Sequence, residues 1–388
     1  MSQAGYPAGA GQRAQIAESV CPGHPDKVAD QISDAVVDAH LSVDPGTRVN
    51  CEVLVTRDRV VATGQITSAA QVDVAEVARK VLDRVGYQDL SVHGMSARHS
   101  RIDVLIDRQS REIADGVDRG GAGDSGIVYG YATDETPELL PLACVLAHGV
   151  ARGLTGASTP RGRRLGPDGK VQVALSTIAG RTSAGVVVSV QHSADTALDE
   201  LRDVVADAIV GPALNARSVT LDTIHVNPAG TFVVGGPSAD AGLTGRKLMV
   251  DTYGGIARHG GGCFSGKDGT KVDRSGAYLA RYLAVNVVAA GLARRCQVGL
   301  GYAIGRSEPV WFDVECFGTA VIDDAAIATR LRAVVDLRVE PVLELFGLRK
   351  FRYLPTATFG HFGRRDEGFP WEDATVAAAL NDRRDEHG

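Results

Sequence analysis

The stretch from Gly260 to Asp273 gathers the residue types that bind a polyphosphate. Within it stand several glycines, the lysines Lys267 and Lys271, and the carboxylate of Asp273. Glycines let backbone N–H groups approach a ligand closely because they carry no Cβ. Lysines supply positive charge, and carboxylates can hold a hard cation such as Mg²⁺. The combination indicates a site for a magnesium-bound polyphosphate.

The same stretch nearly matches a phosphate-loop motif. Gly261, Gly266 and Lys267 have the required spacing, but Asp268 stands where a Ser or Thr should follow. The preceding residues, 254–259, also lack the pattern of a buried hydrophobic strand. A phosphate-loop ATPase or kinase is therefore disfavoured, and a glycine-rich surface loop before a helix remains the simple alternative.

A second motif, Gly23-His24-Pro25-Asp26-Lys27, opens a predicted helix. Pro25 suits the first helical turn, and Asp26 lies where the helix dipole favours a negative charge. A well-capped helix start would explain these residues alone. Together, however, His24, Asp26 and Lys27 place a donor, a metal ligand and a cation beside a helix N-terminus, which suits a phosphate-bearing ligand.

Three further places combine charge with turn-forming residues. Glycines surround Asp124, where a flexible turn is the alternative. Arg246 and Lys247 follow two glycines, where a solvated surface pair is the alternative. Asp168 and Lys170 lie at the start of a predicted strand. An ATP triphosphate carries about four negative charges, so its binding requires several cations together with Mg²⁺.

These motifs lie on elements that repeat three times along the chain. Each round predicts a helix, a two-stranded hairpin and a second helix. The predicted helices are 25–41 and 72–85, 138–153 and 195–210, and 274–293 and 324–335; the hairpin strands are 49–56 with 60–67, 170–178 with 185–191, and 297–304 with 310–317. The repeat predicts an α+β fold of three similar subdomains, with helices on one face of mostly antiparallel sheets. The strands are apolar on both sides, so we expect the sheets to pack against one another across a dimer.

The expected domain organisation follows this repeat. A disordered tail at 1–12 precedes an N-terminal subdomain at 13–119 and a central subdomain at 120–239. A C-terminal subdomain at 240–378 ends in a frayed tail at 379–388.

Length and composition narrow the class of protein. With 388 residues the chain can form more than one hydrophobic core. A net charge of −6 disfavours a general binder of nucleic acid or of an anionic membrane. Six scattered cysteines without a Cys-x-x-Cys pair fit a reducing compartment, so we expect a cytoplasmic protein. No apolar run approaches the roughly 18 residues that a membrane helix needs.

The chain resembles the S-adenosylmethionine synthetase (methionine adenosyltransferase) family from about Ala17 to Trp371. The matching segments include 18–20, 23–27, 30–35, 121–124, 242–255, 260–275, 360–364 and 369–371. The resemblance implies subdomains related by a pseudo-threefold axis, and a homodimer or homotetramer with active sites between subunits. It also implies that methionine sulfur attacks C5′ of ATP, and that the released triphosphate is cleaved to pyrophosphate and phosphate. Mg²⁺, two ions per site, and K⁺ would assist, with no nucleic acid or membrane as partner.

The resemblance also assigns roles to residues of this chain. The implied catalytic residues are His24, Lys170, Arg246, Lys247, Lys267 and Lys271. ATP would contact His24, Asp168, Lys170, Thr231, Phe232, Asp240, Arg246, Lys247, Cys263 and Lys267. Methionine would contact Gln65, Gln109, Asp124, Asp240 and Lys271, while Asp26 and Asp273 would hold Mg²⁺ and Glu52 would hold K⁺. Such a site works through fixed cations that meet the charge growing on the leaving group. It needs no general base, because a thioether has no proton to lose.

Three departures from the family pattern fall on the methionine side. Gln65 replaces a glutamate that contacts the methionine ammonium, and a charge-assisted bond is roughly twice as strong as a neutral one. Ser125 replaces a glutamine, and the segment 109–119, which matches a gating loop, has a shortened link. These departures leave open an enzyme that adenosylates a methionine analogue. A catalytically dead regulatory subunit is a further alternative, against which the retained His24 and Lys267 argue.

Overall fold

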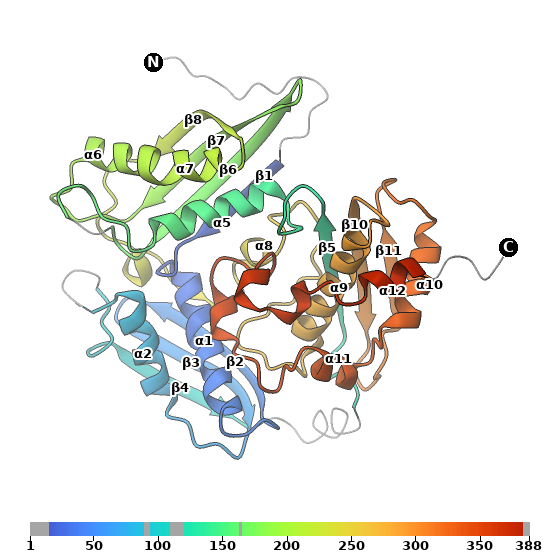
Figure 1. Cartoon of the computed structure of the whole chain (residues 1–388). Coiled ribbons are helices and arrows are strands. Elements are labelled where there is room, and N and C mark those ends of the chain that lie inside the picture. The colour runs from blue at the N-terminus through green and yellow to red at the C-terminus, as the bar shows by residue number, and fades with distance from the viewer. Residues whose placement is uncertain (1–14, 89–93, 109–119, 163–164, 383–388) are drawn as a thin grey trace.

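The computed structural model describes residues 15–88, 94–108, 120–162 and 165–382 (Figure 1). Within these residues the strands form three sheets, each with helices packed on one face. The expected tail at 1–12 lies outside the described residues. Helix α12 (Ala377–Asp382) enters the range expected as the C-terminal tail.

The first sheet has the strand order β4-β3-β2-β9. It contains β2 (Arg48–Thr56), β3 (Arg59–Thr67), β4 (Arg101–Asp107) and the short β9 (Gly242–Leu243). Alternate residues of β2 and β3 are buried against α1 (Pro25–Leu41) and α2 (Val74–Val85), as a sheet with one covered face requires. Helix α2 begins two residues later than predicted because Asp73 caps it, accepting the N–H of Glu76.

The second sheet has the order β1-β6-β7-β8. Its strands are β1 (Gln15–Val20), β6 (Gly169–Ile178), β7 (Arg181–Val190) and β8 (Thr220–Val226). It is covered by α5 (Leu142–Leu154), and a helical stretch follows as α6 (Leu198–Asp203), a π-helix (Val204–Val210) and α7 (Gly211–Asn215). The helix predicted from residue 195 starts at Leu198 because Ser193 and Thr196 form a hydrogen-bonded turn.

The third sheet has the order β11-β10-β5. It consists of β5 (Gly126–Thr133), β10 (Arg295–Tyr302) and β11 (Trp311–Glu315), with α9 (Val272–Ala289) packed on β5 and β10. The C-terminal helices α10 (Asp324–Val334) and α11 (Val339–Leu345) complete this part. Helix α9 ends earlier than predicted, because Gly291 takes a left-handed conformation with φ +70°.

Each of the three sheets contains a strand from another part of the sequence, which in the first sheet is β9, paired with β2. β1 precedes α1 in the chain but pairs with β6, and β5 pairs with β10 rather than with a strand near it in sequence. The predicted α+β class and the three hairpins are confirmed. Two strand pairs, β3 with β4 and β7 with β8, are parallel, so these sheets are mixed. The subdomain boundaries stay a prediction.

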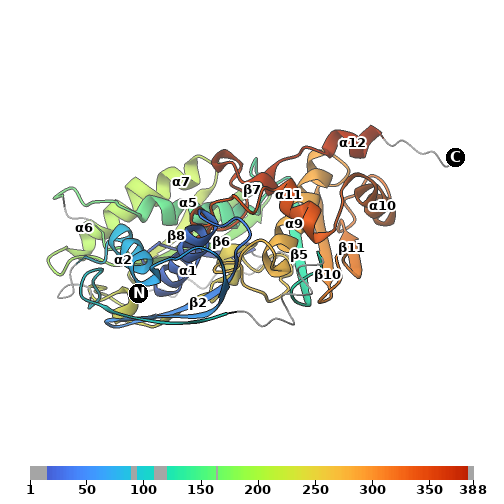
Figure 2. The same cartoon turned by 90° about the horizontal axis from the view of Figure 1, so that it is seen from below.

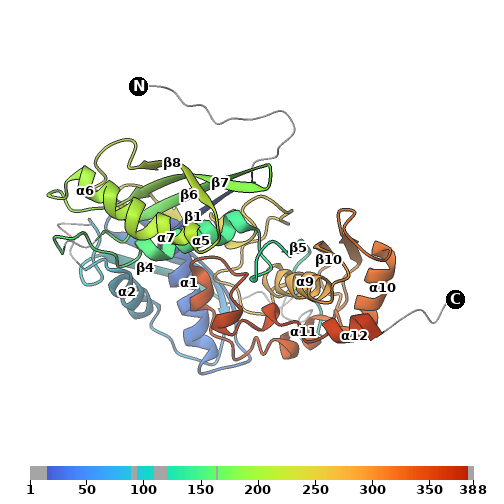
Figure 3. The same cartoon turned by 45° about the horizontal axis from the view of Figure 1, so that its top comes forward.

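The helices lie on one face of each sheet. In the view from below, α2, α7 and α11 lie on one side, and β2 and β10 lie on the other (Figure 2). The two ends of the molecule are formed by α6 and α10 (Figure 3). Helices α1 and α9 lie between the sheets and are buried along nearly their whole length. Among the described residues, no helix has the length and apolar character that a membrane span requires.

Candidate active site

The N-terminus of α1 carries the first group of candidate residues. His24 is the N-cap, and its Nδ1 accepts the backbone N–H of Asp26 at 3.2 Å. Burial, followed by the positive charge of Lys247, lowers the pKa of His24 to about 4. The ring is therefore neutral near pH 7, and because Nδ1 is an acceptor, the proton resides on Nε2. Nε2–H is left as a hydrogen-bond donor for an anion at this helix end.

Two cations approach the same helix end from the turn after β9. Lys247 Nζ lies 2.5 Å from Asp26 Oδ2, and Arg246 Nε lies 3.5 Å from Asp26 Oδ1. Oδ1 also accepts the N–H of Leu243 at 3.0 Å. Burial opposes ionisation of Asp26, but the Lys247 hydrogen bond and the backbone N–H outweigh it and lower the pKa of this carboxyl. Asp26 is thus an ionised, almost fully buried carboxylate between two cations.

A second group lies at the start of α9. Lys267 Nζ is 2.5 Å from Asp273 Oδ2, in the first turn of the helix. Burial opposes the charge on Lys267, but Cys263 and Asp273 outweigh it and raise the pKa of the lysine. A Cβ at Gly262 would lie 2.3 Å from Asp273 Cγ, so glycine is needed there for close approach. The glycine-rich stretch therefore wraps the carboxylate that was expected to hold metal.

Asp268 has a structural role. Its carboxylate is buried, accepts the N–H of Val49 at 2.6 Å and of Thr270 at 2.8 Å, and pairs with Lys271 Nζ at 2.6 Å. The residue that spoils the phosphate-loop motif thus anchors the stretch to β2.

The two groups are neighbours. A Cβ at Gly245 would lie 2.4 Å from Cβ of Cys263, so the turn that bears Arg246 touches the glycine-rich stretch. That stretch then runs beside β2. Gly266 O accepts the N–H of Cys51, and the backbone of Lys267 forms an isolated antiparallel β-bridge with Asn50.

The residues expected near the nucleoside lie beside the first group. Gly23 N–H donates to Pro167 O, which brings the start of β6 next to His24. Asp168 accepts the N–H of Gly236 at 2.7 Å, and burial raises the pKa of this carboxyl to about 6. Lys170 pairs with Glu18 at 2.6 Å.

The remaining nucleoside candidates follow in the segment after β8. The backbone of Phe232 is hydrogen-bonded to His192 in both directions, at 3.0 Å each. Phe232 is half-buried, whereas Thr231 and Asp240 are exposed.

Apart from Lys271, which pairs with buried Asp268, the methionine-side candidates that the structure describes are exposed and more scattered. Glu52 and Gln65 project from the uncovered face of the first sheet, where Asn50 faces Gln65 across the β2–β3 pair. Asp124 is exposed in the turn before β5, and Ser125 Oγ accepts the N–H of Ile304 at 2.9 Å. Gln109 and the gating segment 109–119 lie outside the described residues.

The donor set fits a metal ion only if phosphate also contributes. Within the described ranges, no three or more His, Cys, Asp or Glu side chains gather in a way that could hold a metal. Mg²⁺ usually binds through one or two carboxylates together with phosphate oxygens and water. Asp26 and Asp273 are compatible with that requirement, since each is a carboxylate at a helix start that pairs with a lysine.

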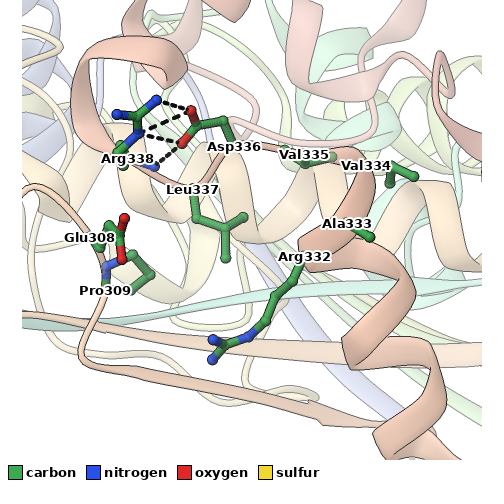
Figure 4. A pocket seen from close by; sticks show the side chains of 9 residues that line it. All are labelled: Glu308, Pro309, Arg332, Ala333, Val334, Val335, Asp336, Leu337 and Arg338. Atoms are coloured by element: carbon green, nitrogen blue, oxygen red, sulfur yellow. Dashed lines mark hydrogen bonds and ion pairs between the residues drawn. The ribbon is translucent and has the colours of Figure 1, made fainter.

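One of the cavities lies among none of these residues. It has a volume of about 530 Å³ and is lined by Glu308, Pro309, Arg332, Ala333, Val334, Val335, Asp336, Leu337 and Arg338 (Figure 4). Arg338 and Asp336 turn toward each other there and form an ion pair. The candidate site is therefore defined by its charges and not by this hollow.

Sequence reasoning misplaced one residue and missed several. Lys27 was counted among the phosphate cations, but its side chain is fully buried and pairs with Asp30 at 2.9 Å and with Asp251. Asp30 and Asp34, which accept the N–H groups of Gly245 and Gly266, were not singled out. Their signal was present as an aspartate at every fourth residue of α1.

Comparison with known proteins matches the chain to one family. Three family models match consecutive parts of the chain: the N-terminal domain of S-adenosylmethionine synthetase at residues 12–111, the central domain at 119–232 and the C-terminal domain at 234–373. A Myxococcus xanthus (strain DK1622) protein described as S-adenosylmethionine synthase is 45% identical over 361 residues, which covers 92% of this chain and 91% of that protein.

The matches define the class of protein as a transferase. All three domains occur in order and cover most of the chain, so it belongs to the S-adenosylmethionine synthetase family. Members of this family use a divalent metal ion and act on ATP and methionine.

Proposed function

We propose that the chain transfers the adenosyl group of ATP to the sulfur of methionine. A sulfur lone pair forms the S–C5′ bond, and the C5′–O bond breaks with its electron pair leaving on the triphosphate. The single observation that carries the proposal is the pairing of buried lysines with carboxylates at the starts of α1 and α9. The description of the Myxococcus xanthus relative supports the same reaction.

The charges around His24 suit the departing triphosphate. The neutral ring presents Nε2–H to the oxygen that leaves C5′, while Arg246, Lys247 and Lys267 bind phosphate oxygens. We assign Lys170 to the same task and Lys271 to the methionine side. These donors and cations are fixed before the reaction, so they stabilise growing negative charge at little reorganisation cost. The second step, cleavage of triphosphate to pyrophosphate and phosphate, would use the same cations.

Two kinds of ion would complete the site. Asp26 and Asp273 would hold Mg²⁺, two ions per site, and Glu52 would hold K⁺. Bound Mg²⁺ supplies neutralising charge on the polyphosphate oxygens. Lys247 and Lys267, which pair with these carboxylates here, would turn toward phosphate when the metal binds.

The contacts to the organic parts of the substrates are assigned by the same argument. Asp168, Thr231, Phe232, Asp240 and Cys263 would contact ATP, and Gln65, Gln109, Asp124 and Asp240 would contact methionine. An enzyme for a methionine analogue would rest on Gln65 and Ser125 alone, and no comparison favours it.

We further propose a homodimer or homotetramer with active sites between subunits, located in the cytoplasm. The uncovered sheet faces carry large exposed apolar residues. Trp311 is 67% exposed and Ile127 is 47% exposed, and both flank Gly301 on the third sheet. Leu105, 62% exposed, lies on the same face as Glu52 and Gln65. Burying these faces against a second copy would bring the methionine-side residues into an enclosed site.

A product assay tests the proposal. The purified chain is incubated with ATP, methionine, Mg²⁺ and K⁺, and the products are followed by mass spectrometry and phosphate analysis. We expect S-adenosylmethionine, pyrophosphate and phosphate in equal amounts. ADP and phosphate without adenosyl transfer would contradict the proposal in favour of an ATPase. Product formed only with a methionine analogue would favour the specialised enzyme.

A further inference from the structure

One face of α1 carries an aspartate at every fourth residue: Asp26, Asp30, Asp34 and Asp38. Residues four apart lie above one another on a helix, so the four carboxylates form a ladder. Each accepts at least one backbone N–H from a segment more than 200 residues away in sequence. Helix α1 is central in the molecule, which lets one face reach all these segments (Figure 1).

Asp30 holds the turn that bears Arg246 and Lys247. Its Oδ1 accepts the N–H of Gly245 at 2.8 Å, directly before the two cations. Its Oδ2 accepts from Lys27 Nζ at 2.9 Å, and both side chains are fully buried. A buried carboxylate that accepts from a backbone N–H and an ammonium forms charge-assisted bonds, which are stronger and more directional than neutral ones.

Asp34 holds the turn that bears Lys267. Its Oδ1 accepts the N–H of Gly266 at 2.9 Å, directly before the lysine. Arg274 binds both oxygens of Asp34, at 2.7 and 3.0 Å, and also donates to Lys267 O at 2.9 Å. The carboxylate and the guanidinium thus clamp the backbone on either side of the Lys267 side chain, next to Asp273.

Asp38 also accepts backbone N–H groups, but the residues that donate them are not candidates for binding phosphate. Its two oxygens accept the N–H groups of Tyr353 and Leu354 at 2.6 and 3.0 Å. Neither residue belongs to the candidate site. Asp38 can therefore serve as the control for Asp30 and Asp34.

We propose that Asp30 and Asp34 are positioning residues for the polyphosphate site, acting through the turns that carry Arg246, Lys247 and Lys267. Neither carboxylate touches substrate. Each fixes the backbone of one cation-bearing turn relative to α1, whose first turn holds His24 and Asp26. A displacement of about 1 Å in a positioned catalytic group can cost on the order of 100-fold in rate. The inference rests on the proposed function, since it assumes that these cations bind phosphate.

The test compares the same substitution at three positions: Asp30→Asn, Asp34→Asn and the control Asp38→Asn. Asparagine keeps the size of the side chain and one acceptor oxygen but loses the charge that anchors it. Binding of inorganic tripolyphosphate with Mg²⁺ is measured by calorimetry, and KM for ATP, KM for methionine and kcat are measured on the same preparations. Thermal unfolding of each variant gives a separate measure of stability.

We expect Asp30→Asn and Asp34→Asn to weaken tripolyphosphate binding about tenfold or more and to raise KM for ATP. KM for methionine should change by less than about twofold. Asp38→Asn should change the unfolding temperature but leave tripolyphosphate binding within about twofold of the unsubstituted chain. These factors correspond to roughly one lost charge-assisted bond at each cation-bearing turn.

Two results would overturn the inference. The first is that Asp30→Asn and Asp34→Asn lose stability yet bind tripolyphosphate normally. The ladder would then only stabilise the fold. The second is an equal loss of binding in Asp38→Asn, because the effect would then not be local to the cation-bearing turns. If Asp30→Asn or Asp34→Asn does not fold, the matching Glu variant, which keeps the charge but shifts the carboxylate by one methylene, takes its place. Unchanged tripolyphosphate binding in that folded variant would equally overturn the inference.

The unsubstituted chain separates this inference from the proposed function. If it neither binds tripolyphosphate nor forms S-adenosylmethionine, the proposed function fails whatever the variants do. If it does both and the Asp30 and Asp34 variants behave like Asp38→Asn, only the positioning role fails.

Discussion

The phosphate side and the methionine side of the candidate site are organised in opposite ways. Asp26, Lys247 and Lys267 keep at most 14% of their side-chain surface exposed, and each is held by a short ion pair or hydrogen bond. Gln65 on β3 and Asp124 in the turn before β5 are exposed, and Lys271, which is 15% exposed, is the exception on the methionine side. The residues proposed to bind phosphate are therefore already held in place in the folded chain, whereas most of those proposed to bind methionine lie on exposed surfaces.

The same contrast appears in the residues that differ from the family pattern. Asp26 and Lys267 match the family motifs, and each forms an ion pair whose partner a substitution would leave as an unpaired, largely buried charge. Removing one partner of a buried ion pair costs about 3–5 kcal/mol. Gln65 and Ser125 are exposed, so their replacement leaves no such penalty. Change is therefore physically easier on the methionine side.

The largest effect that this comparison predicts is at His24. His24→Asn keeps a side-chain acceptor for the N–H of Asp26, so the helix cap survives, but the donor at Nε2 is lost. We expect kcat to fall about 100- to 1,000-fold, the usual cost of removing one donor to a developing oxyanion. Single-turnover formation of S-adenosylmethionine measures the change.

A control on the other side tests whether the contrast holds. Gln65→Ala should lower kcat by less than tenfold and act mainly on KM for methionine. Equal losses of kcat in both variants would show that the two sides are not organised differently.

The sequence predicted well those parts of the fold that local chemistry determines. The bounds of α1 were predicted correctly because His24 and Pro25 mark its start, and the strands of the three hairpins form apolar runs separated by short connections. Strands β1, β4, β8 and β9 were not predicted. Each lies at the edge of a sheet and pairs with a segment distant in sequence, which local periodicity cannot show.

The motifs identify candidate site residues, but the sequence does not show which of their charged side chains are buried away from the others. Lys27 follows Asp26 in the chain, yet Lys27 pairs with buried Asp30 and Asp251, whereas Asp26 pairs with the candidate cations Arg246 and Lys247. Almost all of α1 is buried, so its polar residues give no sign of a solvent face. Asp30 and Asp34 look like ordinary helix-surface carboxylates until the turns that they hold are placed beside them.

A pH experiment can distinguish Asp38 from the other three aspartates of α1. Asp26, Asp30 and Asp34 each pair with a cation, whereas Asp38 has no salt bridge among the described residues. Burial raises the pKa of Asp38 to about 6, with Asp34 adding to the rise and the two backbone N–H groups and Arg274 opposing it. Arg84, on α2, also interacts electrostatically with this carboxyl.

The sign of the effect follows from the raised pKa. The folded chain binds the Asp38 proton more tightly than the unfolded chain, whose aspartates titrate near pH 4. The stabilising contribution is therefore complete below about pH 4 and is lost as the pH rises through about 6. Relative to Asp38→Asn, the unsubstituted chain should lose about 2–3 kcal/mol of unfolding free energy between pH 4 and pH 7. Urea unfolding of both proteins across this range measures the difference, and a difference independent of pH would contradict the assignment.

The smallest predicted effect is at Gln65, where the methionine side is easiest to change. Gln65→Glu places a carboxylate where the family has one, so a methionine ammonium would gain a charge-assisted bond. We expect KM for methionine to fall about three- to tenfold, with kcat and KM for ATP unchanged. Asp107 faces Gln65 across the β3–β4 pair, and its negative charge works against the added carboxylate and keeps the gain modest.

The neutral variant Gln65→Met and an N-acetylated methionine supply the controls for this substitution. Gln65→Met should raise KM for methionine, because it removes the acceptor without adding charge. N-acetylmethionine carries no ammonium group, so Gln65→Glu should gain nothing with it. If Gln65→Glu leaves KM for methionine unchanged, the exposed face around Gln65 does not contact the amine. The methionine side would then have to be sought around Asp124 and Lys271 instead.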